Sequence, residues 1–512
     1  MYLTQGLHRS VQQKPNELAA VFGDRSTTFV ELRNRVAQLA GGFRSLGLKD
    51  GDRIAYYGYN SDRFHEYYLA AFWAGLVVHP INTRWSGSEI AFSLADAGTT
   101  VVIVDDLAVE KDLLAHPAFR ELTALVWAGA GQTPADALPW DELVAAAPID
   151  DRRRNGADLA GLFYTGGTTG FPKGVMLTHE NLVTCAMGAA IHRFVNCEAV
   201  FLHAAPMFHL ADLAAWTVVN LTGGTHVMIP SFSAQLALEA IARHRVTDVV
   251  LVPAMLQALV DYPQIKEFDL GSLRHIGYGG SPISEALLVR TQKMFPDVTL
   301  CQAFGQTELS PITTLLLPHE HSLGSPRLRS AGRAVAHAEI KIVDDEGTEA
   351  ELGSVGEIAA RGPHVMAGYW NRPDETAAVL IDGWMHTGDA GYLDADGYLF
   401  VVDRLKDMII SGGENVYSAE VENALCSHPA VAMAAVFGLP DERWGERVHA
   451  VVVLKPGSAA TEEDLREHAK GLIAGYKCPR SVEFTEALPV TAAGKVLKRE
   501  LRESRLKASA ID

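Results

Sequence analysis

Residues 164–174 place four glycines, three threonines and one lysine within eleven positions. Glycine lets backbone N–H groups turn toward an anion, threonine hydroxyls add donors, and lysine adds a mobile positive charge. Apolar residues flank the stretch and predict strands, so the pattern indicates a phosphate-binding loop between two strands. It is not a Walker A loop, because Pro172 precedes Lys173 and Gly174 follows it, where that motif has Gly-Lys-Ser/Thr. The alternative, a flexible surface linker, accounts poorly for the threonines and the lysine.

The elements that must position this loop alternate between strands and helices. Short apolar runs at residues 53–57, 77–81 and 101–104 predict buried strands, and the capping boxes Thr28-x-x-Glu31 and Ser86-x-x-Glu89 open helices. The alternation resumes between residues 200 and 302. This order predicts mostly parallel sheets flanked by helices.

Two later regions follow other patterns. Residues 339–361 contain short alternating strands broken by turn residues, which predicts a small β-subdomain, and the chain beyond Arg404 predicts a compact α+β unit. A chain of 512 residues is too long for a single hydrophobic core. We therefore predict an α/β protein with a large N-terminal domain of several subdomains, residues 1–404, and a small, mobile C-terminal domain, residues 405–512.

The composition argues against several functional classes. The net charge of −18 argues against nucleic acid or an anionic membrane as the main partner, but it allows a local basic pocket for a phosphorylated cofactor. Residues 1–20 lack the apolar core of a signal peptide, and the longest apolar run, residues 69–78, is too short to cross a bilayer. The five cysteines have no CxxC spacing and indicate reduced thiols. We expect a soluble, cytoplasmic protein without an integral membrane segment, and a homodimer is left open.

The glycine-rich stretch resembles the signature loop of the adenylate-forming enzymes, which include acyl-CoA synthetases, peptide-synthetase adenylation domains and beetle luciferases. In that family the loop holds the β- and γ-phosphates of ATP. The resemblance implies an ATP-binding set made of Thr165, Gly166, Gly167, Thr168, Thr169, Gly170 and Lys173. Gly166 stands where the family usually has serine, so one hydroxyl donor is missing.

Residues 302–308 follow an apolar strand and supply an aromatic ring, a glycine, a threonine and a glutamate. Ligands of open α/β sheets bind at such strand ends. The resemblance assigns Phe304 to adenine stacking, Thr307 to the α-phosphate and Glu308 to Mg²⁺, a hard cation that one carboxylate and phosphate oxygens can bind. The remaining nucleotide-site residues implied here are Gln302, Ala303 and Gly305. The alternative is a strand-end turn with a solvated glutamate.

Residues 278–282, Tyr-Gly-Gly-Ser-Pro, end another predicted strand. They resemble the family segment that lines the adenine and the acyl channel. The resemblance implies nucleotide contacts from Gly280, Ser281 and Pro282 and an acyl pocket that includes Tyr278, Gly279 and Ser310. Taken alone this pattern is weak, because glycine-rich turns between strands and helices are common.

Asp389 follows Thr387-Gly388 and can accept both ribose hydroxyls. Arg404 resembles the second ribose ligand of the family, and Lys406 resembles the hinge about which its C-terminal domain turns. An exposed linker lysine is almost as good an explanation of Lys406. The glycine-rich residues Ser411, Gly412 and Gly413 resemble the loop that lines the channel for coenzyme A.

Lys495 lies in a Gly-Lys turn near the C-terminus and resembles the catalytic lysine of the family. The acid's carboxylate attacks the α-phosphorus of ATP, so two anions meet and the transition state needs local positive charge. Lys495 supplies it in this interpretation, together with Mg²⁺.

His209 follows Pro206-Met207-Phe208, where the acyl-CoA synthetase branch has a residue that gates the carboxylate tunnel. Amino-acid-activating domains usually have an aspartate near this point, so His209 favours an acid without an α-amine. Leu210 and Ala214 lie on the predicted helix that follows and complete the predicted acyl pocket. Ordinary helix packing explains these two residues equally well.

Together these motifs predict an AMP-forming acid–CoA ligase that uses ATP, Mg²⁺ and coenzyme A. It would activate a medium- or long-chain fatty acid or an aryl-propenoic acid as acyl-AMP, and form the thioester after the C-terminal domain rotates. The main alternative is an adenylating enzyme that loads the thiol of a carrier protein. A nucleotide-binding sensor without turnover and a luciferase-type oxygenase are further alternatives. The sequence leaves the individual acid open.

Overall fold

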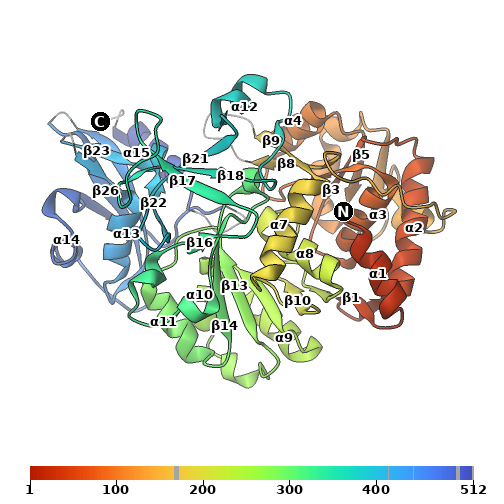
Figure 1. Cartoon of the computed structure of the whole chain (residues 1–512), viewed down its shortest axis with the longest axis horizontal. Coiled ribbons are helices and arrows are strands. Elements are labelled where there is room, and N and C mark those ends of the chain that lie inside the picture. The colour runs from red at the N-terminus through yellow and green to blue at the C-terminus, as the bar shows by residue number, and fades with distance from the viewer. Residues whose placement is uncertain (166–171, 413, 442, 492–495, 510–512) are drawn as a thin grey trace.

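The computed structural model describes residues 1–165, 172–412, 414–441, 443–491 and 496–509. The red N-terminal helices lie at one end of the molecule and the blue C-terminal unit at the other (Figure 1). The described strands form four sheets. This arrangement confirms the predicted fold class.

The first sheet has nine described strands in the order β16-β15-β14-β13-β12-β10-β11-β1-β2. The neighbours from β14 to β1 are parallel, and the outer pairs are antiparallel. In chain order the strands are β1 (Leu18–Phe22), β2 (Arg25–Thr28), β10 (Val200–His203), β11 (Thr225–Met228), β12 (Asp248–Leu251), β13 (His275–Gly279), β14 (Thr299–Phe304), β15 (Thr314–Leu316) and β16 (Arg333–Ala334). Its helices are α7 (His179–Ile191), α8 (Leu210–Thr222), α9 (Ala234–His244), α10 (Pro253–Val260) and α11 (Glu285–Met294).

The second sheet has eight described strands in the order β19-β9-β8-β4-β3-β5-β6-β7. It is parallel from β8 to β7, whereas β9 and β19 are antiparallel to their neighbours. Its strands are β3 (Arg53–Tyr57), β4 (Val77–Pro80), β5 (Val101–Val104), β6 (Ala124–Trp127), β7 (Leu138–Pro139), β8 (Leu159–Thr165), β9 (Lys173–Thr178) and β19 (Gly368–Tyr369). The helices of the N-terminal region are α1 (Gln5–Gln13), α2 (Phe29–Ser45), α3 (Asp62–Ala74), α4 (Gly87–Ala97), α5 (Asp106–Glu110) and α6 (Trp140–Val144).

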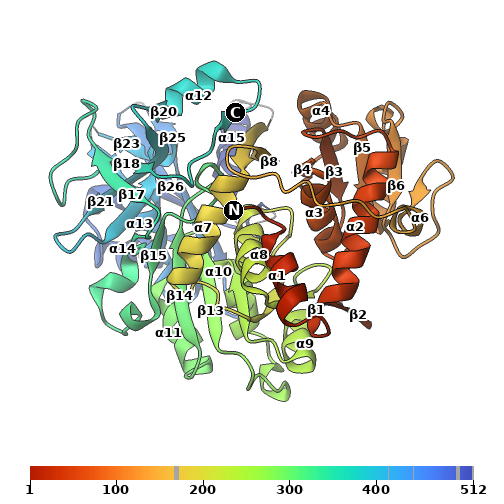
Figure 2. The ribbon, with the colours of Figure 1, turned by 45° about the vertical axis from the view of Figure 1, so that its right-hand side comes forward.

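Helices α3, α7 and α8 lie near the middle of the molecule in Figure 2, between the strands of these two sheets. Tyr68 of α3 and Trp216 of α8 pack with ring centroids 5.2 Å apart, inside one continuous core that also contains residues of both sheets. Both sheets therefore share this helical layer, and burial of its aromatic surface holds them together.

The remaining strands form two smaller sheets of five described strands each. The β-subdomain contains β17 (Glu339–Val343), β18 (Gly356–Arg361), β20 (Leu380–Ile381), β21 (Trp384–Leu393) and β22 (Leu399–Arg404), with α12 (Pro373–Val379) beside it. The C-terminal unit contains β23 (Ile409–Ser411), β24 (Glu414–Val416), β25 (Val431–Asp441), β26 (Gly445–Leu454), β27 (Ser481–Phe484), α13 (Ser418–Cys426), α14 (Glu462–Lys470) and α15 (Lys498–Ser509). The domain boundary between residues 404 and 405 stays a prediction.

The two predicted capping boxes are present and explain where α2 and α4 begin. The Thr28 side chain accepts a hydrogen bond from the backbone of Glu31, whose carboxylate accepts one from the Thr28 backbone at 2.8 Å. Ser86 and Glu89 form the same pair at the start of α4. No helix among the described residues is long and apolar enough to cross a bilayer.

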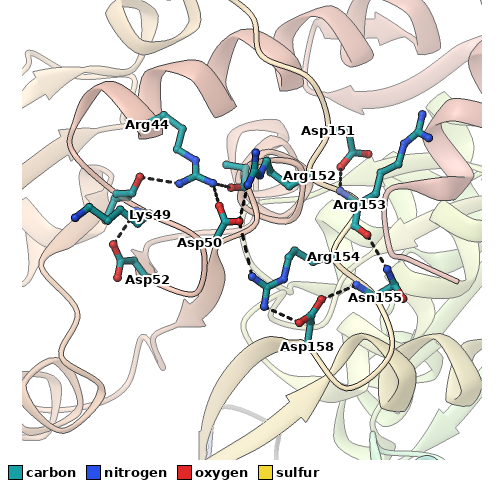
Figure 3. A network of polar contacts seen from close by, with 12 residues as sticks. Arg44, Lys49, Asp50, Asp52, Asp151, Arg152, Arg153, Arg154, Asn155 and Asp158 are labelled. Atoms are coloured by element: carbon teal, nitrogen blue, oxygen red, sulfur yellow. Dashed lines mark hydrogen bonds and ion pairs between the residues drawn. The ribbon is translucent and has the colours of Figure 1, made fainter.

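An arginine cluster anchors the segment that leads into β8. Figure 3 shows Arg44, Arg152 and Arg154 directed toward the Asp50 carboxylate, with the Arg152 contact at 2.8 Å and the Arg154 contact at 3.9 Å. Arg154 also pairs with Asp158 at 2.6 Å, one residue before β8 begins. The contacts tie residues 152–158 to the turn after α2, and so fix the start of the strand that ends at the glycine-rich loop.

Several buried histidines make the folded state sensitive to acid. Burial lowers the pKa of His65, His79 and His364 to about 3 in each case. A histidine in an unfolded chain has a pKa near 6.5, so the unfolded state binds more protons between these values. Stability contributed by these neutral side chains is complete above about pH 6.5 and is lost as the pH falls toward 3.

We expect His79→Gln to flatten this dependence. The Nδ1 atom of His79 lies 3.0 Å from Thr99 Oγ1, a contact that a glutamine amide can replace without titrating. The slope of unfolding free energy against pH, from urea titrations between pH 6.5 and 4.5, should fall by about 1.4 kcal/mol per pH unit. His319→Gln is the control, because the His319 side chain is 72% exposed. Equal slopes in wild type and His79→Gln would contradict the assignment.

Candidate active site

The glycine-rich loop connects two strands, as the sequence predicts, and the structure shows that these strands are antiparallel. Strands β8 and β9 form a hairpin in which Thr165 pairs with Lys173. The predicted phosphate-binding residues Gly166, Gly167, Thr168, Thr169 and Gly170 lie outside the described residues. The structure therefore describes the two ends of the loop, and the phosphate-binding assignments stay predictions.

Lys173 lies between a carboxylate and an aromatic ring. Its Nζ forms an ion pair with Glu375 of α12, and it also lies 5.1 Å from the centroid of the Tyr369 ring. The Lys173 side chain is 27% exposed, so its ammonium is partly accessible to a ligand. Both partners come about two hundred residues after Lys173 in the sequence, and they reach it because β19, the strand before α12, pairs with β9.

Glu308 sits in a single 3₁₀ turn, Thr307–Leu309, just after β14. Gly305 makes the approach to this turn possible, since a Cβ at that position would lie 1.8 Å from the carbonyl oxygen of Pro311. The Glu308 residue is buried, and its Oε1 accepts a hydrogen bond of 2.9 Å from the Tyr369 hydroxyl. Burial and the Glu308 carboxylate raise the pKa of that hydroxyl, which keeps it protonated as a donor.

Residues 364–366 hold the Glu308 turn through two hydrogen bonds. Ser310 is buried, and its hydroxyl donates to the carbonyl of His364 at 2.7 Å. The backbone N–H of Met366 donates to the Glu308 carbonyl at 2.8 Å. Ser310 thus has an anchoring contact, and its predicted place in the acyl pocket stays a prediction.

Asp389 and Arg404 face each other across β21 and β22. They are register partners, and Arg404 Nε lies 3.1 Å from Asp389 Oδ1. Arg404 is 42% exposed, whereas Asp389 is largely buried. The Gln306 amide donates to the Thr387 carbonyl at 3.2 Å, which links this pair to the Glu308 turn. Two predicted nucleotide motifs, about eighty residues apart in sequence, therefore lie next to each other.

The predicted adenine segment lies beside the end of β14. Strands β13 and β14 are parallel, with Gly279 opposite Ala303 and Tyr278 opposite Gln302. Residues 280–282 leave β13 as a loop before α11, next to Phe304 at the end of β14. Two predicted nucleotide segments thus lie together at the C-terminal ends of β13 and β14. They are Gly280, Ser281 and Pro282, and Gln302, Ala303, Phe304 and Gly305.

Tyr278 points into the core. Its side chain is fully buried, and its hydroxyl lies 2.9 Å from His321 Nε2. Burial raises the pKa of the Tyr278 hydroxyl and lowers that of His321 to about 4. This contact gives Tyr278 a packing role, and its predicted contact with the acyl group stays a prediction, as does that of Gly279.

The loop before α8 is held by two side chains from outside it. The Asn60 amide donates to the carbonyl of Ala205 at 2.8 Å and accepts from the backbone N–H of Met207 at 2.7 Å. The Tyr68 hydroxyl donates to the Met207 carbonyl at 2.7 Å. His209 ends this loop as the N-cap of α8 and accepts from the Ala211 backbone at 3.1 Å. The two side chains therefore fix the loop to within two residues of His209.

Leu210 and Ala214 lie on α8 and are buried in the main core. A cavity of about 330 Å³ opens beside the loop that precedes them. Its lining residues are Gly58, Tyr59, Asn60, Thr83, Arg84, Ala204, Pro206, Phe208, Pro230, Ser231, Phe232, Val252, Ala254, Met255 and Val490. Val490 belongs to the C-terminal unit, and its carbonyl accepts a hydrogen bond of 2.7 Å from Arg84. The cavity therefore lies where the two units meet.

Family models match most of the chain. One described as AMP-binding enzyme matches residues 7–370, and one described as AMP-binding enzyme C-terminal domain matches residues 420–495. The chain belongs to the AMP-binding enzymes. The segment between the two matched ranges contains the predicted domain boundary and the predicted hinge Lys406.

Relatives and solved structures agree with this family over nearly the whole chain. A feruloyl-CoA synthase from an Amycolatopsis species is 40% identical over 96% of this chain and 97% of its own length. A fatty acid–[acyl-carrier-protein] ligase from Streptomyces coeruleorubidus is 37% identical over 98% and 96%. The structure of an amide bond synthetase from Marinactinospora thermotolerans superimposes with a TM-score of 0.87 at 32% identity, over 98% of this chain and 99% of that one. This AMP-binding enzyme is an adenylate-forming acid–thiol ligase.

The C-terminal unit of the AMP-binding enzyme carries the remaining predicted residues. Lys406 lies in the 3₁₀ turn Leu405–Asp407, and Ser411 is buried at the end of β23. Gly412 has φ +64°, and a Cβ there would lie 2.9 Å from the Trp444 ring, so the turn requires glycine. Gly413 and Lys495 lie outside the described residues. The hinge, channel and catalytic-lysine roles stay predictions.

Sequence reasoning missed Tyr369, Asn60 and Tyr68. Tyr369 contacts both Lys173 and Glu308, and the other two residues hold the loop that ends at His209. The signal for Tyr369 is faint: an aromatic residue after Gly368 in an otherwise ordinary short strand. Among the described residues no group of three or more His, Cys, Asp or Glu side chains could hold a metal ion by itself.

The predicted ribose contact of Asp389 gives a direct test. In Asp389→Asn the amide keeps the shape but loses the charge that strengthens a hydrogen bond to a hydroxyl, so we expect AMP to bind about ten- to a hundredfold more weakly by calorimetry. Asp394→Asn is the matched control, because the Asp394 carboxylate accepts only backbone N–H groups of its own turn in the contacts described. Equal AMP affinities in wild type and Asp389→Asn would refute the ribose assignment.

Proposed function

We propose that this AMP-binding enzyme converts an apolar carboxylic acid into its acyl-AMP and then into its coenzyme A thioester. The observation that carries the proposal is that Lys173 and Glu308 both contact Tyr369, Lys173 at the ring and Glu308 at the hydroxyl. One is a cation suited to phosphate groups, and the other is a buried carboxylate suited to a hard metal ion. Asp389 and Arg404, joined to the same turn through Gln306, suit the ribose.

In the proposed first half-reaction an oxygen of the acid forms a bond to the α-phosphorus of ATP. The bond from that phosphorus to the bridging oxygen breaks, and pyrophosphate leaves. Because the acid and the phosphate are both anions, we assign Lys495 and Thr307 to the developing charge on the α-phosphate. We assign Glu308 to Mg²⁺, which supplies charge neutralisation on the phosphates when it is bound. A single carboxylate completed by phosphate oxygens fits the donor set at this turn.

In the proposed second half-reaction the thiol sulfur of coenzyme A forms a bond to the acyl carbonyl carbon. The bond from that carbon to the phosphate oxygen breaks, AMP leaves, and the thiol proton is released. We assign Ser411, Gly412 and Gly413 to the channel for the thiol arm, reached after the C-terminal unit rotates about Lys406. Gly412 supports this assignment, because its contact with Trp444 brings the backbone close to an aromatic surface.

For the acid we propose an aryl-propenoic compound first and a medium- or long-chain fatty acid second. The 40% identity to a feruloyl-CoA synthase favours the first class. The apolar, buried side chains of Leu210 and Ala214, beside His209, support an acid without charge beyond its carboxylate. The five cysteines are free, which supports our proposal that the enzyme works in the reducing cytoplasm.

Loading of a carrier-protein thiol is the second candidate, favoured by the 37% identity to a fatty acid–[acyl-carrier-protein] ligase. The two candidates share the first half-reaction and differ in the acceptor. An acceptor assay therefore separates them.

AMP production with coenzyme A, measured for acids from acetate to long-chain fatty acids, cinnamates and benzoates, tests the proposal. We expect one preferred group, with the hydroxycinnamates highest, and little AMP without coenzyme A. Pyrophosphate release that coenzyme A does not accelerate, but a carrier protein does, would replace our proposal with the second candidate. Acceleration by an amine alone would point to amide formation.

Lys495→Ala separates the half-reactions. We expect acid-dependent pyrophosphate release to fall by about a hundredfold or more, because the charge near the α-phosphate is lost. Thioester formation from supplied acyl-AMP should stay within about twofold of wild type, since Lys495 is withdrawn in that step. Lys470→Ala, a surface lysine of the C-terminal unit, is the control. Equal loss in both half-reactions would argue against the proposed rotation.

A further inference from the structure

Tyr369 touches both charged groups on which the proposed function rests. It lies in β19 opposite Val175, two residues beyond Lys173 in β9. Its hydroxyl donates to Glu308 Oε1 at 2.9 Å, and its ring lies 5.1 Å from the Lys173 ammonium. The residue itself is only 8% exposed, so it lies behind these groups.

We infer that Tyr369 is a positioning residue that orients the Glu308 carboxylate toward the metal ion and supports the Lys173 ammonium beside the phosphates. This inference rests on the proposed roles of Glu308 and Lys173. A tyrosine suits both tasks, because its hydroxyl donates to a carboxylate at one end while its ring face attracts a cation. Phenylalanine can do only the second, and leucine neither.

The strand that carries Tyr369 is held firmly on both sides. The Ala367 backbone donates to the Met176 carbonyl at 3.0 Å, and the Trp370 backbone donates to the Gly174 carbonyl at 2.8 Å. The Tyr369 backbone donates to Thr376 Oγ1 at 2.9 Å. Because Met366 also donates to the Glu308 carbonyl, one short strand fixes the distance between the hairpin and the Glu308 turn.

A carboxylate that binds a metal ion is usually oriented by a hydrogen bond from behind it, and removal of such a partner weakens metal binding about ten- to a hundredfold. The hydroxyl of Tyr369 occupies that position relative to Glu308. Lys173 is supported differently, since its ammonium also pairs with Glu375, a contact independent of the hydroxyl. The two functions of Tyr369 can therefore be separated by substitution.

The test uses the full-length enzyme with the analogue α,β-methylene-ATP, and Mn²⁺ bound to the complex is measured by electron paramagnetic resonance. We expect Tyr369→Phe to weaken Mn²⁺ binding about ten- to a hundredfold, and to leave the affinity for the analogue at saturating Mn²⁺ within about twofold. Tyr369→Leu also removes the ring, and we expect it to weaken analogue binding by a further two- to thirtyfold. Glu375→Gln should leave the Mn²⁺ affinity unchanged, because Glu375 contacts Lys173 alone of these groups.

Tyr398→Phe is a matched control. The Tyr398 hydroxyl donates to the buried carboxylate of Glu320, a bond of the same kind in another part of the molecule. We expect it to lower the melting temperature like Tyr369→Phe but to keep the wild-type Mn²⁺ affinity. If Tyr369→Phe loses only thermal stability and binds Mn²⁺ as wild type does, Tyr369 is merely structural and the inference is overturned.

The wild-type enzyme tests the proposed function separately. Absence of acid-dependent pyrophosphate release from wild type across the acid panel would reject the proposed function and, with it, this inference. Release by wild type together with unchanged Mn²⁺ binding in Tyr369→Phe would reject the inference alone.

Discussion

Repulsion between like charges is the constraint on which this active site depends. In the reaction that we propose, the phosphates of ATP, the carboxylate of the acid and the enzyme's own Glu308 are all negative, and they would come together in a protein whose net charge is −18. The positive groups are therefore local, and each has its own support. Lys173 is held by Glu375 and the Tyr369 ring, and Arg404 is held by Asp389. A cation fixed in advance stabilises developing charge without reorganisation during the reaction.

The fold supplies this preorganisation by joining distant segments at the edges of its sheets. Strand β19 brings residues 368–369 beside β9, and parallel pairing of β13 and β14 sets residues 280–282 beside Phe304. Backbone hydrogen bonds hold each of these strand pairs together, and such bonds are costly to break when they are buried. The shared helical core then joins the two large sheets.

Local features of this architecture could be predicted from the sequence, and long-range pairings could not. The capping boxes at Thr28 and Ser86 depend on residues three positions apart, and both are present. By contrast, β1 joins the first sheet because Ala20 pairs with His226, two hundred residues later, and no local pattern indicates that partner. Tyr369 was missed for the same reason, since its importance comes from pairing with β9. Helix α15 gives a weak signal in the sequence, because it is strongly polar, although Leu501 packs in a small hydrophobic cluster with Phe437 and Leu439.

The contacts between the two units suit the rotation we propose for the second half-reaction. A rotation moves atoms in proportion to their distance from the axis, so contacts near residue 406 change least. Asp403, three residues before Lys406, accepts a hydrogen bond from the Ser418 hydroxyl at 2.6 Å, and that hydroxyl accepts one from Lys498 at 2.6 Å. These bonds lie beside the hinge and can persist. The hydrogen bond from Arg84 to the Val490 carbonyl is solvent-exposed, and both residues are far from Lys406 in sequence. Breaking one such bond costs only about 1 kcal/mol. In the rotation that we propose, strong contacts near residue 406 and a weak one at the cavity would let the small unit turn while it stays attached.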